Sequence, residues 1–228
     1  MTVVALPGTF CPPAVFDRLA AELGPDVPVE AWSWLTRPGP WDIPAVAADL
    51  AAQLEQPVVL LGHSTGGAIA LQLALTRPDL IKALILVDTG AHMKDHGDVE
   101  SILRSLRGGV DPALLAAVLD RSFHVPLEPT LRQEWLAWAA QVPPEAAHDV
   151  LASQHELDFR PLLAQILAPT LILHGVYDQA RPVRHAEELV AGIPDARLQL
   201  LPTGHTPVHE APEPVSAAIR LLIDRVIA

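Results

Sequence analysis

The sequence is poor in several residue types, and each shortage excludes a class of protein. Cys11 is the only cysteine among 228 residues, which excludes an intrachain disulfide framework and a multi-cysteine metal site. Lysine and arginine number 15 against 27 aspartates and glutamates, for a net charge of −12. That charge opposes contact with nucleic acid phosphates and with anionic membrane surfaces. We therefore expect no nucleic acid partner and no membrane partner.

Long hydrophobic runs are also missing. No apolar run approaches the roughly 18 residues that cross a membrane, and the run Ala83–Val87, preceded by Lys82, is typical of a buried strand. The first residues carry no basic region ahead of their short apolar run, so they do not resemble a secretory signal. We expect a cytoplasmic protein, with which a single cysteine is compatible.

What is abundant is hydrophobic residues, at 50% of the chain, which allow a sizeable core. Six short continuous apolar runs predict strands that are buried on both faces: Val3–Leu6, Val29–Trp32, Val58–Leu61, Ala83–Val87, Thr170–His174 and Arg197–Leu201. Helical patterns lie among them: Val15–Leu23, Ile43–Gln53, Gly66–Thr76, Val183–Ala191 and Val215–Val226. This alternation predicts an α/β fold with a mostly parallel sheet flanked by helices.

The region from residue 90 to residue 160 breaks the alternation. It contains four helical patterns and no convincing strand: Val99–Leu106, Ala113–Asp120, Thr130–Ala140 and Glu145–Ser153. We expect residues 1–89 and 161–228 to form the core domain and residues 90–160 to form a helical cap. Such a lid would cover the carboxyl ends of the strands, where open α/β sheets bind their ligands.

The most informative segment is Gly62-His63-Ser64-Thr65-Gly66, a G-x-S-x-G pattern between a predicted strand and a predicted helix. This is the context of a nucleophile elbow. Side chains at both glycine positions would collide in so sharp a turn. Ser64 is expected to project as the nucleophile, and the Thr65 N–H, at the helix N-terminus, to face a developing oxyanion. The alternative is a glycine-rich cap of an ordinary helix.

A serine hydroxyl needs an adjacent base, and position selects one of the ten histidines. His205 lies in a loop just after the last predicted strand, and Asp178 follows the strand before it. Asp178 would accept a hydrogen bond from the His205 ring and stabilise the imidazolium. Asp88, at the end of the neighbouring strand, is the alternative acid. Asp178 as a turn or N-cap residue and His205 as a surface histidine are the alternatives without catalysis.

The remaining site residues come from two segments. Gly8 permits a tight loop after the first strand, so we expect the second oxyanion N–H from Thr9, with Phe10 as the alternative. Phe10 is also a candidate for the substrate pocket. Trp135 and Trp138, three residues apart on a predicted cap helix, either line that pocket or pack in the core.

Two further features are interpreted as structural rather than as ligand-binding sites. His92 and His96 have a spacing that suits a metal ion on a helix, but the residues between and after them indicate a loop. Cys11 is expected to be a small buried apolar residue. We therefore expect no metal and no cofactor.

Three motifs together resemble the α/β-hydrolase superfamily, in the branch that has a helical cap and contains esterases, lactonases and carbon–carbon hydrolases. The motifs are the elbow around Ser64, the segment Ala168–Gly175 with Asp178 and Pro182, and Gly204–Glu210 followed by Pro212-Glu213. The resemblance covers nearly the whole chain. It implies catalytic roles for Ser64, Asp178 and His205, whose order in the chain is the one expected of this fold.

The sequence departs from the family in two places. Pro7-Gly8 stands where the family often has His-Gly in the oxyanion loop, and the chain begins at what resembles the family's third strand. The sheet should therefore have about six strands. Serine at position 64, rather than aspartate, is unlike the nucleophile of the dehalogenase and epoxide hydrolase relatives.

The resemblance implies a serine hydrolase that cleaves a small carboxylic ester, thioester or lactone through an acyl-enzyme. The partner would be a small-molecule substrate, and the protein a monomer or homodimer. The alternatives are carbon–carbon hydrolysis, perhydrolysis or lyase chemistry with the same residues, a catalytically silent ligand-binding protein, and a partner-binding module. Carbon–carbon hydrolysis needs a group that binds a keto acid, and the candidates are Arg104, Arg107, Arg121 and Arg160.

Overall fold

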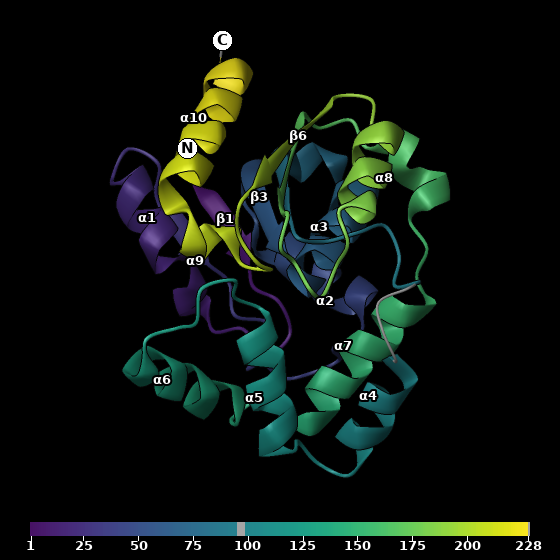
Figure 1. Cartoon of the computed structure of the whole chain (residues 1–228). Coiled ribbons are helices and arrows are strands. Elements are labelled where there is room, and N and C mark those ends of the chain that lie inside the picture. The colour runs from purple at the N-terminus through teal and green to yellow at the C-terminus, as the bar shows by residue number, and fades with distance from the viewer. Residues whose placement is uncertain (95–98, 228) are drawn as a thin grey trace.

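The computed structural model describes residues 1–94 and 99–227 and contains one parallel sheet of six strands in the order β2-β1-β3-β4-β5-β6 (Figure 1). Every neighbouring pair of strands is parallel. The strands are β1 (Val3–Leu6), β2 (Val29–Ala31), β3 (Val58–His63), β4 (Ile81–Val87), β5 (Thr170–Gly175) and β6 (Ala196–Leu201). The predicted α/β fold and its six-stranded sheet are confirmed.

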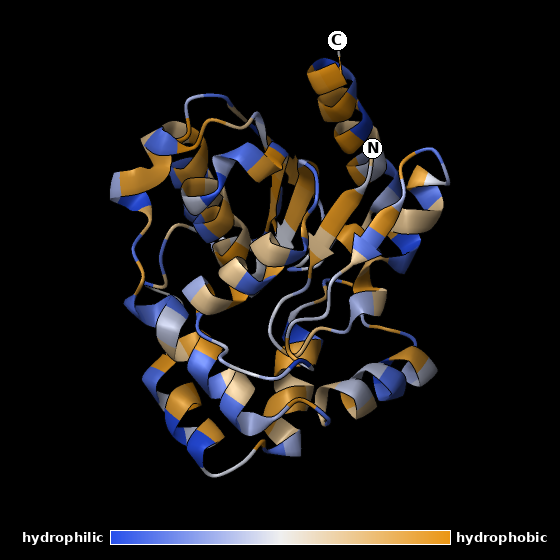
Figure 2. Cartoon of the chain, turned by 180° about the vertical axis from the view of Figure 1, so that it is seen from behind, coloured by the Kyte–Doolittle hydropathy of each residue, from blue (hydrophilic) through white to orange (hydrophobic). Residues whose placement is uncertain are grey.

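Helices cover both faces of the sheet because successive strand residues point to opposite sides. In β1, Val3 and Ala5 join a core cluster that contains residues of α1 (Asp17–Leu23) and α10 (Pro212–Ile227). Val4 and Leu6 join a second cluster with residues of α2 (Ile43–Gln53), α3 (Thr65–Thr76) and α8 (Arg184–Gly192). Figure 2 shows the resulting hydropathy pattern, with hydrophobic strands at the centre of the core.

Proline sets several helix boundaries that the apolar pattern placed too late. The helix predicted from Val15 begins as a 3-10 turn over Pro13–Phe16 before α1, and the one predicted from Val215 begins at Pro212. Proline suits the first turn of a helix because its missing N–H has no intrahelical partner there. Short helices also lie at Pro78–Leu80 (η2) and at Pro207–Glu210 (α9).

The described residues between β4 and β5 form helices that lie beyond the strand ends, beneath the sheet in Figure 1. They are α4 (Val99–Arg107), α5 (Pro112–Arg121), α6 (Pro129–Ala139) and α7 (Pro144–Glu156). The 3-10 helix η3 (Arg160–Gln165) follows them in the chain but packs against α8, beside the sheet. A single isolated bridge joins His92 to Asp158. In the part of the chain that the structure describes, none of the helices has both the length and the hydrophobicity needed to cross a bilayer.

Candidate active site

Ser64 occupies a strained turn between β3 and α3. Its φ is 54° and its ψ is −118°, a region that side-chain-bearing residues rarely adopt. A Cβ on Gly62 would lie 2.4 Å from the Gly66 carbonyl oxygen, and a Cβ on Gly66 would lie 2.2 Å from the Leu6 carbonyl oxygen. The turn therefore closes only with glycine at both positions. Its backbone is held by the Thr89 hydroxyl, which donates to the Ser64 carbonyl over 2.8 Å.

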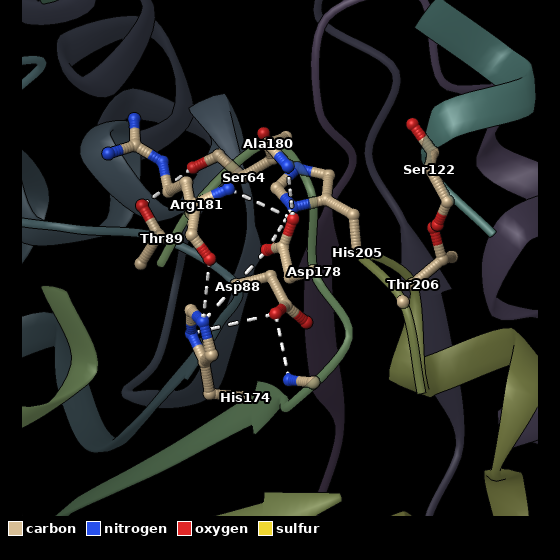
Figure 3. Close-up of polar contacts among 12 residues, drawn as sticks. Ser64, Asp88, Thr89, Ser122, His174, Asp178, Ala180, Arg181, His205 and Thr206 are labelled. Atoms are coloured by element: carbon tan, nitrogen blue, oxygen red, sulfur yellow. Dashed lines mark hydrogen bonds and ion pairs between the residues drawn. The ribbon is translucent and has the colours of Figure 1, made fainter. Parts of the chain in front are cut away.

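His205 comes from the loop after β6 and pairs with Asp178 from the loop after β5 (Figure 3). The His205 Nδ1 lies 2.6 Å from Asp178 Oδ2. The other carboxylate oxygen accepts the N–H groups of Ala180 and Arg181 over 2.7 and 2.9 Å. Burial by itself would raise the pKa of Asp178, but the charge and hydrogen bond of His205 hold that pKa below its usual range. An ionised Asp178 requires the proton on Nδ1, which leaves Nε2 of a neutral ring free to accept one.

The His205 loop is anchored by residues that sequence reasoning did not assign. His63 Nε2 lies 2.8 Å from the His205 carbonyl oxygen. Burial, and then the nearby His205, lower the pKa of His63 to about 3, so the ring is neutral and Nε2 donates. Glu210 accepts from the N–H groups of Gly204 and His124, each over 2.8 Å. The only sequence signal for Glu210 was its place in the motif around His205.

The loop after β1 passes beside Ser64, because a Cβ on Gly8 would lie 3.0 Å from the Ser64 Cβ. Among the described residues, the backbone N–H groups of Thr9, Phe10 and Thr65 have no acceptor. The Thr9 hydroxyl donates to the Thr65 hydroxyl over 2.9 Å, and the latter donates to Gln154 Oε1 over 3.1 Å. No motif in the sequence pointed to Gln154, a buried residue of α7.

Ser64 and His205 line one cavity of about 100 Å³ between the strand ends and helices α4 to α7. Most of its wall is aliphatic or aromatic, and it includes the predicted pocket residues Phe10 and Trp135. Trp138 does not line it, so of its two predicted alternatives the structure shows packing in the core and not a place in the pocket. Residues three apart on a helix are about 60° apart around its axis. Trp135 packs against Phe123, whereas Trp138 packs against the other core cluster.

The structure also places Asp88, the alternative acid, and Cys11, the single cysteine. Asp88 is fully buried and does not contact the His205 ring; its Oδ1 accepts the Gly175 N–H over 2.9 Å. Cys11 is only partly buried and lines the cavity, so the expectation of a fully buried residue is wrong. Burial raises the pKa of its thiol to about 12, which favours the protonated form. His96 lies outside the described residues.

His92 does lie near two other potential metal ligands, His185 and Glu188, with the three ligand atoms within 4.8 Å of one another. Its Nδ1 accepts the Lys94 N–H over 2.9 Å, so its ring proton is on Nε2. That nitrogen lies 2.9 Å from Glu188 Oε2. A histidine that binds a metal needs a free lone pair on the nitrogen that faces the ion, whereas Nε2 of this ring carries the proton.

Comparison with known proteins identifies the family. The profile of the alpha/beta hydrolase family matches residues 3–218. Lipase LipV of Mycobacterium tuberculosis is 30% identical, over 90% of this chain and 87% of that protein. Pimeloyl-(acyl-carrier protein) methyl ester esterase of Neisseria meningitidis is 27% identical, over 92% of this chain and 88% of that protein. The solved esterase of Thermogutta terrifontis has a TM-score of 0.82 at 26% identity, over 99% of this chain and 90% of that one. This chain therefore belongs to the alpha/beta hydrolase family.

Proposed function

We propose that this protein is a serine hydrolase that cleaves small carboxylic esters, thioesters or lactones through an acyl-enzyme. The observation that carries the proposal is the 2.6 Å contact between His205 and Asp178, beside a Ser64 that shares a cavity wall with His205. The relatives named as a lipase and as a methyl ester esterase support ester hydrolysis. The size of the apolar cavity supports a small acyl group. Its volume of about 100 Å³ is less than that of a cavity of about 150 Å³, which holds benzene.

In this mechanism Ser64 Oγ attacks the ester carbonyl while His205 Nε2 takes the hydroxyl proton. Asp178 orients the ring and stabilises the imidazolium. The N–H groups of Thr65 and Thr9 bind the oxyanion of the tetrahedral intermediate. His205 then protonates the leaving alcohol, and it later activates the water that releases the acid.

Residues 90–160 would act as a cap in this mechanism. Their helices supply the apolar wall opposite the strand ends, which includes Leu115 and Leu136. A water-poor wall strengthens the electrostatic interactions that stabilise the oxyanion. The cap would therefore set both the acyl preference and the dielectric environment of the reaction.

The decisive experiment is turnover of p-nitrophenyl esters of increasing acyl length by wild type and by Ser64→Ala. We expect activity in the wild type alone, strongest for short chains. Labelling by a fluorophosphonate probe should occur in the wild type and be lost in Ser64→Ala. Undiminished ester turnover by Ser64→Ala would sink the mechanism. A labelled wild type without ester turnover would favour another reaction of the same residues, and an unlabelled one a silent ligand-binding protein.

A carboxylate-bearing substrate is a second candidate, supported by one residue. Of the four arginines that could bind an acid, only Arg121 lines the cavity, and no described residue forms a hydrogen bond or ion pair with it. The other three have partners: Arg104 with Glu100, Arg107 with His148, and Arg160 with Asp158. This candidate includes esters of dicarboxylic acids and the keto acids of carbon–carbon hydrolysis.

A further inference from the structure

A second buried carboxyl group lies beside Asp178 and has no part in the mechanism above. Asp88 directly follows β4, and neither its side chain nor that of Asp178 has any solvent exposure. His174 lies with both of them, and one ligand atom from each of the three residues lies within 4.8 Å of the others (Figure 3). Two ionised carboxylates at such close range in a dry environment repel each other strongly.

The protonation of His174 follows from its partners. Its Nε2 lies 3.0 Å from the Arg181 carbonyl oxygen, which only accepts, so Nε2 carries a proton. Burial lowers the pKa of His174, so the ring is neutral and Nδ1 has a lone pair. Nδ1 lies 3.5 Å from Asp88 Oδ1, so its lone pair faces that oxygen. An ionised Asp88 would therefore face a second acceptor there rather than a donor.

The rest of the surroundings supplies too few donors for an ionised Asp88. Its Oδ1 accepts the Gly175 N–H, while its Oδ2 is buried without a donor among the described residues. Asp178 and, more weakly, Glu210 oppose a negative charge on it. Arg181 favours that charge, but its guanidinium donates to the His92 carbonyl. An ionised carboxylate with an unpaired buried oxygen is costly, whereas a neutral acid supplies its own donor.

We propose that Asp88 and Asp178 hold one proton between them, carried by Asp88, and that Asp88 acts as a neutral acid that positions the carboxylate paired with His205. The proposal rests on the proposed function of that pair. Burial and the negative charge of Asp178 raise the pKa of Asp88 well above its usual value, in agreement with the geometry. A neutral Asp88 can donate a hydrogen bond to Asp178, which would lower the pKa of Asp178.

Asp88→Asn tests the proposal because an amide has the shape of a neutral acid and donates an N–H. Asp88 does not line the cavity, so KM should change little in any variant. We expect Asp88→Asn to keep the acid-side midpoint of the kcat/KM–pH profile within about 0.3 unit of wild type. Asp88→Ala, which lacks the donor, should lower kcat by about tenfold or more. Recovery of kcat in the asparagine variant over the alanine variant would identify positioning by hydrogen bonding.

The opposite outcome is equally measurable. If Asp88 is ionised, Asp88→Asn removes a negative charge near the imidazolium and lowers the acid-side midpoint by about one unit. That shift, or equal kcat in the asparagine and alanine variants, would overturn the proposal.

Infrared spectroscopy supplies a readout that needs neither activity nor a folded variant. Wild type at pH 7 should show the carbonyl band of a protonated carboxyl group. Its absence would overturn the proposal even if Ser64→Ala confirmed the serine mechanism. In a folded Asp88→Asn variant the band should be missing, whereas Asp79→Asn, which changes an exposed carboxylate paired with Arg77, should retain it.

Discussion

The hydroxyl of Thr9 donates to the hydroxyl of Thr65 over 2.9 Å, joining the loop after β1 to the first residue of α3. The Thr65 hydroxyl in turn donates to Gln154 Oε1 of α7 over 3.1 Å. The backbone N–H groups of the two threonines are the proposed oxyanion donors. The hydroxyl chain therefore controls the spacing of those amides and couples it to a helix of the region between β4 and β5.

Replacing Thr65 by valine should break this connection without changing the shape of the residue. Thr9 then loses its acceptor and Gln154 its donor, while the Thr65 amide remains. We expect kcat on a p-nitrophenyl ester to fall about tenfold, with KM little changed, because the interaction is used in the transition state. The matched control, Thr65→Ser, keeps the hydroxyl and should stay close to wild type. Equal kcat values for the two variants would contradict the coupling.

Gly66→Ala should be severely destabilising. Its Cβ would lie 2.2 Å from the Leu6 carbonyl oxygen and 2.8 Å from the Pro7 carbonyl oxygen, and both are backbone atoms, which cannot shift as readily as the end of a flexible side chain. We expect the free energy of unfolding in urea to fall by about 3 kcal/mol or more. Gly108→Ala is the control, because its nearest contact is at 3.5 Å. A Gly66→Ala protein as stable as the control would refute this account of the turn.

Buried histidines make stability depend on pH below neutrality. Burial lowers the pKa of His209 to about 4, and a histidine in an unfolded chain titrates near 6.5. Between these values the unfolded chain binds more protons, so stability that is present above about pH 6.5 is lost as the pH falls toward 4. His209→Phe keeps an aromatic ring beside Trp135 and should reduce the loss at pH 5 by about 1 to 2 kcal/mol.

The measurement is urea unfolding at pH 7 and at pH 5. His155→Phe changes an exposed histidine and serves as the control, since it should leave the pH dependence as in wild type. The burial argument fails if His209→Phe loses as much stability on acidification as that control.

Arg121 should discriminate between charged and neutral acyl groups. We expect Arg121→Gln to lower the ratio of kcat/KM for a carboxylate-bearing ester to that for a neutral ester of equal length by about tenfold, a value typical of one lost ionic hydrogen bond. Arg104→Gln, outside the cavity, is the control. An unchanged ratio in Arg121→Gln would remove the second candidate substrate class.

Local pattern was sufficient to predict much of the fold. All six predicted runs became strands of one sheet. The four inner strands are largely buried, as continuous apolar runs predict, whereas the prediction of burial on both faces is wrong for the edge strands β2 and β6, which are partly exposed. The need for glycine at position 62 is also local, since its Cβ would meet backbone atoms of Gly66 and Gly67. The need for glycine at position 66 depends on the packed sheet, because its Cβ would meet the end of β1. The predicted helix starts were less accurate. Apolar periodicity begins at the first buried residue and therefore misses the proline that begins the first turn.

Predicting the site required information on long-range contacts in addition to local pattern. The sequence placed Asp178 and Asp88 at the ends of neighbouring strands, and both have the chemistry of an acid partner. Only the packed sheet decided that Asp178 lies 2.6 Å from His205, while Asp88 is enclosed beneath it. The reason is that direction and burial of a side chain depend on distant segments. The same limit explains the absence of Trp138 from the cavity and the unexpected role of Gln154, whose partner is 89 residues away in the chain.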